Sequence, residues 1–263
     1  MNTALLAVRA LWKREVLKFV RDKSRIFGAL AQPLGFWLLL GFGFERSFRA
    51  PAAAGSELSY IEFLFPGIVA LIILFTAIFS TISIVEERKS GFLQAALVAP
   101  TSRLTLVFGN TLGGTSLAVV ETLLFLLLLP VIGVIPSVTS ISLVLLTTIL
   151  IGVAFTSLGF IIAWRMDSTR GFHAIMNLFL LPLWLLSGAP FPIDGASPVL
   201  RWIMVVNPVT YAVDALRQAI YWPSTAVEPF VSLPAALAIT FVFALAMLAL
   251  AAHSIRKPLY GLA

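Results

Sequence analysis

The sequence has no cysteine, only two histidines and few charged side chains for its length. Without cysteine, the chain can build neither a disulfide framework nor a thiolate metal site. Charged residues make up 11% of the chain and apolar residues 60%, whereas a soluble domain has about 25% and about 45–50%, respectively. This composition excludes a disordered chain and an ordinary soluble domain, and it indicates a membrane protein with several spans.

Six apolar stretches approach or exceed the roughly 20 residues that a spanning helix needs. They are 26–44, 63–85, 104–129, 141–164, 172–193 and 231–252. Glu121 is the only ionisable side chain inside them apart from histidine. The stretches are continuous rather than alternating, which favours helices over the strands of a barrel. The sequence therefore predicts an all-α membrane protein, with one domain of six transmembrane helices over 26–263.

The basic residues between these stretches predict the orientation of the chain. Of the 18 Lys and Arg residues, 14 fall on one predicted side, in 1–25, 86–103, 165–171 and the C-terminal tail. The other four fall in 45–62 and 194–230. Because cytoplasmic loops carry the excess of Lys and Arg, both termini are expected in the cytoplasm. An even number of spans requires the same placement.

Residues 1–25 precede the first stretch and are predicted to form an amphipathic helix over 3–23. At about 100° per residue, one face is apolar and Arg14, Lys18 and Arg21 lie opposite. The apolar residues are Leu5, Val8, Trp12, Val16, Phe19 and Val20. Such a helix lies in the membrane interface with its cations toward the headgroups. It serves as a topology anchor, as a lever that touches a cytoplasmic partner, or as both.

Segment 86–103 is the most informative cytoplasmic piece. Its charged start, Glu86 to Lys89, leaves the membrane, Gly91 permits a bend, and Pro100 ends a short helix. That helix carries an apolar stripe made by Phe92, Leu93, Ala96 and Leu97. The stripe packs on lipid, on the chain's own bundle or in a groove of another protein, and the pattern does not choose among them.

Segment 194–230 is long but poor in charge. Ser197-Pro198 and Asn207-Pro208 are cap-plus-proline starts, which predict two short helices over 198–206 and 208–222. Asp214 and Arg217 are three residues apart, so their side chains can pair. Four nearby aromatic residues, Trp202, Tyr211, Tyr221 and Trp222, indicate that these helices lie at the outer interface or dip into it. They either cap the bundle or act as an exit-side gate.

The glycine-rich run 109–116 resembles a phosphate-binding loop, but Thr115 stands where that loop requires lysine. The chain therefore cannot bind ATP by this motif. Gly109 and Gly113 instead form a small-residue pair that lets two helices approach closely. The two histidines lack carboxylates at a spacing that would complete a metal site.

Glu121 is exceptional because a carboxylate at the centre of a bilayer costs on the order of 3 kcal/mol. It is either a protonated group bonded to a neighbouring helix or a residue that contacts substrate or protons. Phe75, Phe79 and several Ser and Thr residues lie in the same stretches. If they line a pathway rather than pack helices together, they suit an amphiphile: a hydrophobic drug, a lipid or a lipid-linked glycan.

Three pieces together resemble the permease subunits of bacterial type-2 ATP-binding-cassette exporters. The first contains Glu86, Glu87, Arg88, Gly91, Leu93 and Pro100; the others are Leu186 to Pro192 and Asn207 to Arg217. The resemblance covers nearly the whole chain. It implies a bacterial inner-membrane protein that is not itself an enzyme and carries no cofactor. ATP and Mg²⁺ are expected on a separate ATPase subunit.

The resemblance also implies an assembly and roles for particular residues. Two permease chains, forming a homodimer with the pathway at their interface, are expected to join two ATPase copies, with lipid but no nucleic acid as a further partner. The helix near 91–98 is implied to be a coupling helix in a cleft of the ATPase, and 196–222 to be re-entrant outer helices. The coupling residues are Glu86, Glu87, Arg88, Gly91, Phe92, Leu93, Leu97 and Pro100. The outer-gate residues are Asn207, Pro208, Tyr211, Asp214 and Arg217. The alternative is a membrane anchor or assembly subunit of an envelope-biogenesis complex that carries no solute.

Overall fold

The computed structural model describes residues 3–21, 23–45, 58–91, 93, 102–193, 195–224 and 228–256, without the side chains of 3, 4, 23–27 and 29. All regular structure within these residues is helical. The helices are α1 (Thr3–Arg21), α2 (Lys23–Phe44), α3 (Tyr60–Ser80), α4 (Ile82–Lys89), α6 (Leu104–Leu126), α7 (Val138–Ala163), α8 (Thr169–Leu185), α9 (Pro198–Val206), α10 (Pro208–Ile220) and α11 (Leu233–Ser254), with a short 3₁₀ helix, η1, at Leu129–Ile132.

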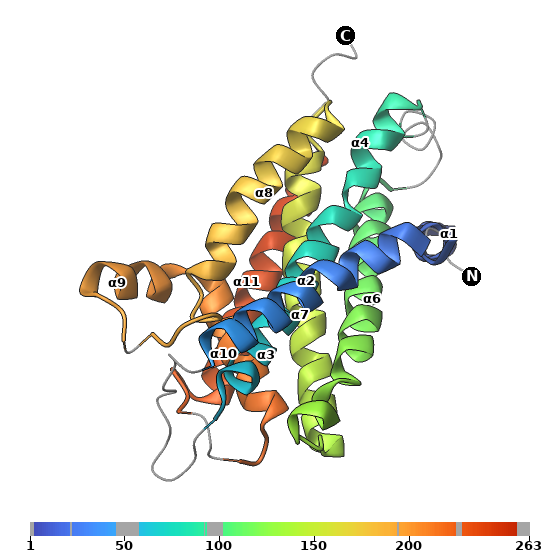
Figure 1. Ribbon diagram of the computed structural model, residues 1–263. Coiled ribbons are helices and arrows are strands. Elements are labelled where there is room, and N and C mark those ends of the chain that lie inside the picture. The colour runs from blue at the N-terminus through green and yellow to red at the C-terminus, as the bar shows by residue number, and fades with distance from the viewer. Residues whose placement is uncertain are drawn as a thin grey trace.

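Each of the six apolar stretches contains a helix, and successive stretches run in opposite directions (Figure 1). In chain order, the six stretches correspond to α2, to α3 together with α4, and then to α6, α7, α8 and α11. Within the described residues, three helical stretches are long and apolar enough to cross a membrane: Tyr60–Lys89, Val138–Ala163 and Leu233–Ser254. α9 and α10, bent by 82° at their junction, form a fourth if they are counted as one span. The all-helical class is confirmed, and six crossings remain a prediction.

α3 is the central helix of the bundle. It packs against α2, α6, α7, α8 and α10, and its residues from Leu64 to Leu74 are almost completely buried. The segment from Leu64 to Leu74 has apolar residues on every side of the helix, and such a helix is typically buried on all sides. The helix begins at a capping box in which Ser59 and Glu62 each bond the other's backbone N–H.

α1 lies close against α6 because two glycines of α6 leave room for it. A Cβ atom added at Gly109 would lie 2.7 Å from Cβ of Leu11, and one at Gly113 would lie 2.8 Å from Cβ of Glu15. The expectation that Gly109 and Gly113 permit close helix approach is therefore confirmed. The partner is the amphipathic N-terminal helix, whose Trp12 also donates a 2.9 Å hydrogen bond from Nε1 to Ser116.

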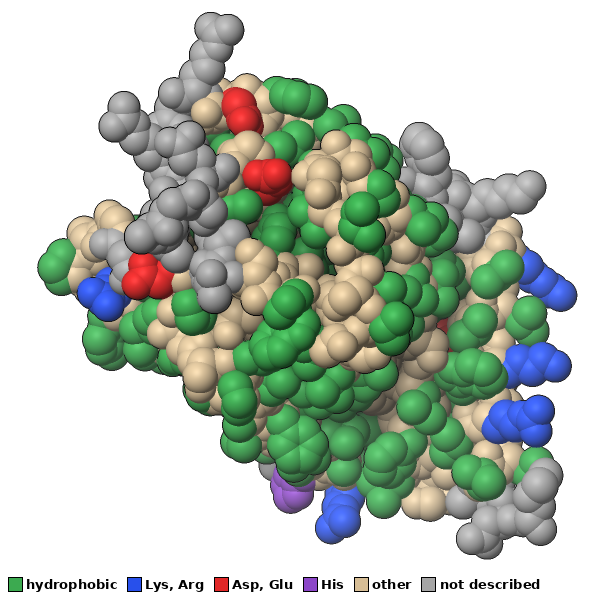
Figure 2. Space-filling model, turned by 90° about the horizontal axis from the view of Figure 1, so that it is seen from below, with side chains coloured by type: hydrophobic (Ala, Val, Ile, Leu, Met, Phe, Trp, Pro, Cys, Tyr) green, Lys and Arg blue, Asp and Glu red, His purple; other side chains and the backbone are tan. Residues whose placement is uncertain are grey.

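The outside of the bundle is largely apolar. Side chains on several helices, including Leu39, Phe42, Leu178 and Val242, have more than half of their surface exposed. Figure 2, a view from below onto the end of the bundle, shows hydrophobic side chains among other residue types, with Lys and Arg at the periphery. An apolar exterior of this extent fits contact with lipid rather than with water.

Several helix ends differ from the expected boundaries. α8 ends at Leu185 rather than Ile193, and Gly188 then turns the chain with φ of +79°. Trp184 bonds the carbonyl of Gly67 in α3, and Ala189 packs against the same glycine. α6 ends at Leu126, and α10 ends at Ile220. The N-terminal helix ends at Arg21, and α2 already begins at Lys23. The helices beginning at Pro198 and Pro208 are where the cap-plus-proline pattern predicts them.

Candidate functional site

The structure contains a cavity of about 500 Å³ between α1, α2, α3, α4, α6 and α8. Its wall combines aromatic and aliphatic side chains with hydroxyls, amides and two carboxylates. The lining residues are Phe19, Gly28, Gln32, Pro33, Leu71, Phe75, Thr76, Phe79, Ser80, Ile82, Glu86, Leu117, Glu121, His173 and Asn177. A mostly apolar concave site with a few polar groups is the usual form of a small-molecule site.

The structure brings Phe75, Phe79 and Glu121, the three pathway residues proposed from the sequence, into the wall of this one cavity. Glu121 has no exposed surface, and the Thr76 hydroxyl donates a hydrogen bond to its Oε2. Glu86, in contrast, is exposed on α4. The cavity therefore extends from an exposed carboxylate to one that is fully enclosed.

Aromatic rings form a continuous group on one side of the cavity. The ring centroids of Phe75 and Phe79 are 5.6 Å apart, and the imidazole of His173 stacks on Phe79 at 5.2 Å. Nδ1 of His173 lies 2.9 Å from the carbonyl oxygen of Thr169, which fixes the ring on α8. Such a surface offers flat apolar contacts beside polar groups.

Three polar residues of the cavity wall were not proposed from the sequence: Gln32, His173 and Asn177. His173 and Asn177 are four residues apart on α8, so they share one helix face. That spacing of polar residues within an apolar stretch was the available signal. The sequence could not show that the same face meets Phe79 of α3.

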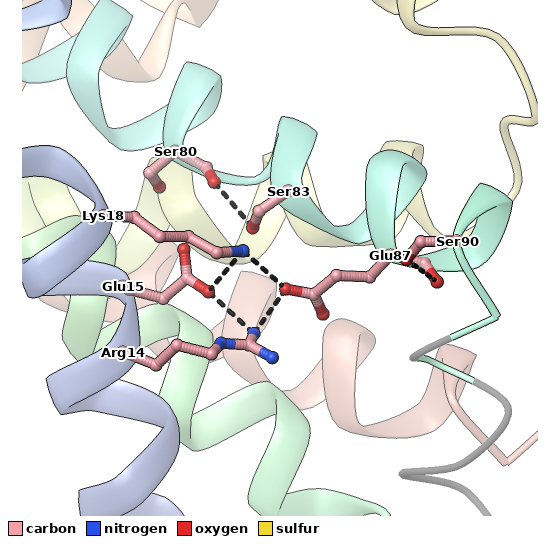
Figure 3. A network of polar contacts seen from close by, with 7 residues as sticks. All are labelled: Arg14, Glu15, Lys18, Ser80, Ser83, Glu87 and Ser90. Atoms are coloured by element: carbon pink, nitrogen blue, oxygen red, sulfur yellow. Dashed lines mark hydrogen bonds and ion pairs between the residues drawn. The ribbon is translucent and has the colours of Figure 1, made fainter. Parts of the chain in front are cut away.

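At the end of α4, Glu87 faces the N-terminal helix. Oε1 of Glu87 accepts a 3.0 Å hydrogen bond from Nζ of Lys18 and also pairs with the guanidinium of Arg14. Arg14 pairs as well with Glu15 at 2.8 Å, and both carboxylates are buried (Figure 3). Arg14 and Lys18, which were expected to face lipid headgroups, thus also pair with two buried carboxylates of the bundle.

The next residue, Arg88, faces the turn between α7 and α8 instead. Its guanidinium donates to the carbonyls of Trp164 and Met166, the latter at 3.2 Å, and pairs with Asp167 at 2.6 Å. These carbonyls follow the end of α7, where backbone acceptors lack partners within the helix. Arg88 thus satisfies the C-terminus of α7 and places a positive charge where the helix dipole favours one.

The rest of the proposed coupling helix is only partly described. Gly91 turns the chain after α4 with φ of +77°, as the bend expected there requires. Leu93 is 2% exposed and belongs to the chain's own hydrophobic core, which is the packing on its own bundle that the sequence left open. Phe92, Leu97 and Pro100 lie outside the described residues.

At the opposite end of the bundle, Asn207 joins three helices. Its Oδ1 accepts a 3.0 Å hydrogen bond from the N–H of Val209 and so caps α10, which has Pro208 in its first turn. Its Nδ2 donates to the carbonyls of Leu183 and Leu186, at 2.7 and 2.8 Å. The bend between α9 and α10 is therefore fixed to the end of α8.

Asp214 and Arg217, whose spacing allows them to pair, attract each other electrostatically, but each side chain makes hydrogen bonds to backbone groups elsewhere. Asp214 accepts hydrogen bonds from the N–H groups of Phe230 and Val231, each at 3.1 Å, which hold the segment that enters α11. Arg217 is 7% exposed and donates a 3.0 Å hydrogen bond to the carbonyl of Gly188. Its guanidinium lies 4.2 Å from the ring centroid of Phe63, a cation–π contact.

Two tyrosines, together with Asn207, Asp214 and Arg217, complete the group of bonded residues at this end of the bundle, the outer group. Tyr211 donates a 2.8 Å hydrogen bond to the carbonyl of Val205, joining α10 to α9. Tyr221, just beyond α10, donates a 2.6 Å hydrogen bond to the carbonyl of Glu62 in α3. Burial raises the pKa of the Tyr221 hydroxyl above its ordinary value, so it stays a donor. The outer-gate residues thus tie α8, α9, α10, α11 and α3 together.

Comparison with known proteins identifies the family. A family model described as ABC-2 type transporter matches residues 7–221, from α1 to the end of α10. The chain belongs to this family. The match includes every helix that lines the cavity, the end of α4 and the outer group. It therefore confirms the resemblance inferred from the sequence.

Curated relatives agree with the ABC-2 assignment. The chain is 25% identical over 210 residues to the putative transport permease ycf38 of Cyanophora paradoxa, covering 79% of this chain and 71% of the relative. It is 26% identical over 213 residues to nodulation protein J of Sinorhizobium fredii, covering 80% and 79%. It is 30% identical over 161 residues to ABC transporter G family member 20 of Dictyostelium discoideum, covering 60% and 22%.

Proposed function

We propose that this chain is the permease subunit of an ATP-driven exporter that moves an amphiphilic substrate outward by alternating access. The substrate class is a hydrophobic drug, a lipid or a lipid-linked glycan. The cavity is the observation that carries the proposal: its aromatic wall suits an apolar portion, while Thr76, Gln32, Asn177 and Glu121 suit a polar portion. Membership of the ABC-2 family and relatives named transport permeases support the same class of function.

The proposal includes a topology and an assembly. Six spans with cytoplasmic termini are supported by the alternating helices and by the position of the basic segments. The end of α4, the α7–α8 turn and the end of α11 lie at one end of the bundle, whereas α9 and α10 lie at the other (Figure 1). Two such chains, forming a homodimer in a bacterial inner membrane, bind two ATPase subunits that carry ATP and Mg²⁺. Glu86, Gly91 and the segment after it form the contact with the ATPase.

Transport by the reconstituted complex tests the function. With the partner ATPase present, amphiphilic substrates are expected to stimulate ATP hydrolysis and to be moved across proteoliposomes. Phe79→Ala and Glu121→Gln should lower transport of the same substrate at unchanged ATPase association. Phe241→Ala, at a half-exposed position of α11, is the matched control. Normal export by both cavity variants, or strict selectivity for an inorganic ion, contradicts the proposal, and the absence of any transported solute favours the anchor alternative.

Cysteine labelling tests the topology, because the native chain has no thiol. A cysteine at Ser90 should react with an impermeant reagent only from the cytoplasmic side, and a cysteine at Glu228 only from outside. Both positions are exposed, so burial does not limit the reaction. Labelling of the Ser90 cysteine from outside contradicts the orientation.

A further inference from the structure

Two consecutive residues of opposite charge, Glu87 and Arg88, connect the end of α4 to two different neighbours. Glu87 reaches α1 through Arg14 and Lys18. Arg88 reaches the turn between α7 and α8. We refer to the first group, with Glu15, as the Glu87 link, and to Arg88 with Trp164, Met166 and Asp167 as the Arg88 link. Figure 3 shows the Glu87 link between α1 and α4.

The Glu87 link joins two helices through side chains. α1 packs its length against α6, and long side chains span the space between α1 and α4. Glu87 and Glu15 are 7% and 6% exposed, and Lys18 lies 3.0 Å from Glu87 and 3.9 Å from Glu15. Charges with little access to water attract more strongly than exposed ones. The removal of a basic partner leaves two buried carboxylates with less compensation, so the link is specific to this arrangement.

The Arg88 link fixes the start of α8 relative to α4. The guanidinium bonds carbonyls at Trp164 and Met166, directly before the Ser168 cap of α8. It also lies 5.9 Å from the ring centroid of Trp164. The planar guanidinium of Arg88 donates to backbone carbonyls of the turn between α7 and α8. This turn therefore has little freedom to move relative to α4.

Both linked elements form walls of the cavity. Phe19, which follows Lys18 on α1, lines the cavity on one side, and His173 and Asn177 of α8 line it on another. α4 itself contributes Ile82 and Glu86. Leu93 lies beside both links, since it borders a small space together with Arg14, Glu87 and Trp164. A displacement of Leu93 therefore reaches both links.

We infer that Glu87 and Arg88 are positioning residues that divide one displacement of the α4 end between two walls of the cavity, Glu87 moving α1 and Arg88 moving α8. The inference rests on the proposed function, because the displacement is supplied there by the ATPase. It predicts separable defects. Loss of Glu87 removes the connection between α1 and α4 but leaves α8 attached to α4. Loss of Arg88 removes the connection between α8 and α4 but leaves α1 attached.

Spin-label distances on the otherwise cysteine-free chain test this division directly. Labels at Lys13 and Ser90 report α1 against α4, and labels at Ser90 and Arg170 report α4 against α8; all three positions are exposed. In the wild-type permease in nanodiscs, both distance distributions should be narrow. Glu87→Gln should broaden only the first, and Arg88→Gln only the second. Lys89→Gln, at the exposed neighbouring position, should change neither.

A second variant on the other side of the Glu87 link protects the test against a general folding defect. Lys18→Met should reproduce the selective broadening caused by Glu87→Gln. Equal broadening of both distances by Glu87→Gln and by Arg88→Gln, or no broadening by either, overturns the inference. These distances are measured on the permease without nucleotide, so their outcome does not depend on the proposed transport activity.

Transport adds the functional measurement. In the reconstituted complex, Glu87→Gln and Arg88→Gln should each lower the amount of substrate moved per ATP hydrolysed about fivefold or more, the lower end of typical coupling between sites. ATPase association and hydrolysis without substrate should persist. An unchanged transport ratio in both variants overturns the inference while leaving the proposed function standing. A wild-type complex that transports nothing contradicts the proposed function, and the distances then still decide whether the links are separable.

Discussion

The hydroxyl of Tyr221 donates a 2.6 Å hydrogen bond to the backbone carbonyl of Glu62. In a regular helix this carbonyl accepts from the N–H four residues later, but that residue is Pro66, which has no N–H. The tyrosine therefore replaces a donor that the helix itself lacks. A contact between residues 159 positions apart thus completes the backbone bonding of the central helix.

Tyr221→Phe should lower the free energy of unfolding by about 1–3 kcal/mol, because it leaves a carbonyl without its donor away from water. In a Pro66→Ala background the residue at 66 supplies its own N–H, so the same substitution should cost much less. Thermal unfolding in detergent of the four chains of this cycle measures the difference. An equal loss in both backgrounds means that the hydroxyl does not replace the missing N–H.

Gly113→Ala should separate α1 from α6. The new methyl group would lie 2.8 Å from Cβ of Glu15, and relief of such overpacking costs about 1–3 kcal/mol. Gly35→Ala in α2 is the matched control, because nothing lies within 4 Å of its Cβ position and alanine favours a helix over glycine by up to about 1 kcal/mol. Melting temperatures of the two variants should move in opposite directions. A stable Gly113→Ala protein would show that α1 can sit farther from α6.

Thr76→Val should destabilise the centre of the bundle while keeping its shape. The substitution removes the hydroxyl that donates to the buried Glu121 carboxyl, at a cost of about 1–3 kcal/mol. Thr76→Ser keeps the donor and serves as the control, although it removes a methyl group. Unfolding monitored by tryptophan fluorescence should give a higher free energy of unfolding for Thr76→Ser than for Thr76→Val. The reverse order would assign the stability to packing alone.

Asp214→Asn should loosen the segment that leads into α11. The carboxylate accepts from two backbone N–H groups and from Nε2 of Gln218 at 3.0 Å. An amide can accept on only one of its two positions, so one donor would face another donor. Hydrogen exchange at Phe230 and Val231 should speed up about tenfold, which corresponds to about 1.4 kcal/mol. Glu228→Gln, at an exposed position, should leave that exchange unchanged.

Local chemistry explains the parts of the fold that the sequence predicts well. The starts of α9 and α10 at Pro198 and Pro208 follow from a cap residue and a proline whose preferred dihedral angle suits the first turn. The apolar stretch 141–164 differs from α7 by a few residues. Both signals lie within one helix and need no knowledge of its neighbours.

Contacts between distant elements explain most of the errors. Helical spacing allows Arg217 to pair with Asp214, but it cannot show that the bundle also gives Arg217 the ring of Phe63 and the carbonyl of Gly188. The end of α8 at Leu185 could not be found from hydropathy, because the stretch stays free of charge to Ile193 and Ala189 packs on Gly67 of α3. Partners supplied by tertiary structure leave no periodic pattern in the chain.

The candidate site was predictable to the same degree. Glu121 stood out as a charge in an apolar stretch, and Phe75 and Phe79 share a helix face by their spacing of four. Phe19 and His173 could not be added, because only the packing of α1 and α8 brings them to the same cavity. The structure gives Glu87 and Arg88 partners within the chain, which the sequence could not show, and their role in coupling to an ATPase stays a prediction.

The bond from Tyr221 to Glu62 also has a consequence for the order in which the protein is made. A ribosome synthesises α3 well before residue 221. When α3 first forms, the carbonyl of Glu62 therefore has neither the N–H that Pro66 lacks nor the hydroxyl of Tyr221 as a donor. The early helix must satisfy that carbonyl with water, with a lipid headgroup or with the insertion machinery. Its native bonding is completed only when α10 has emerged and the chain has closed on itself.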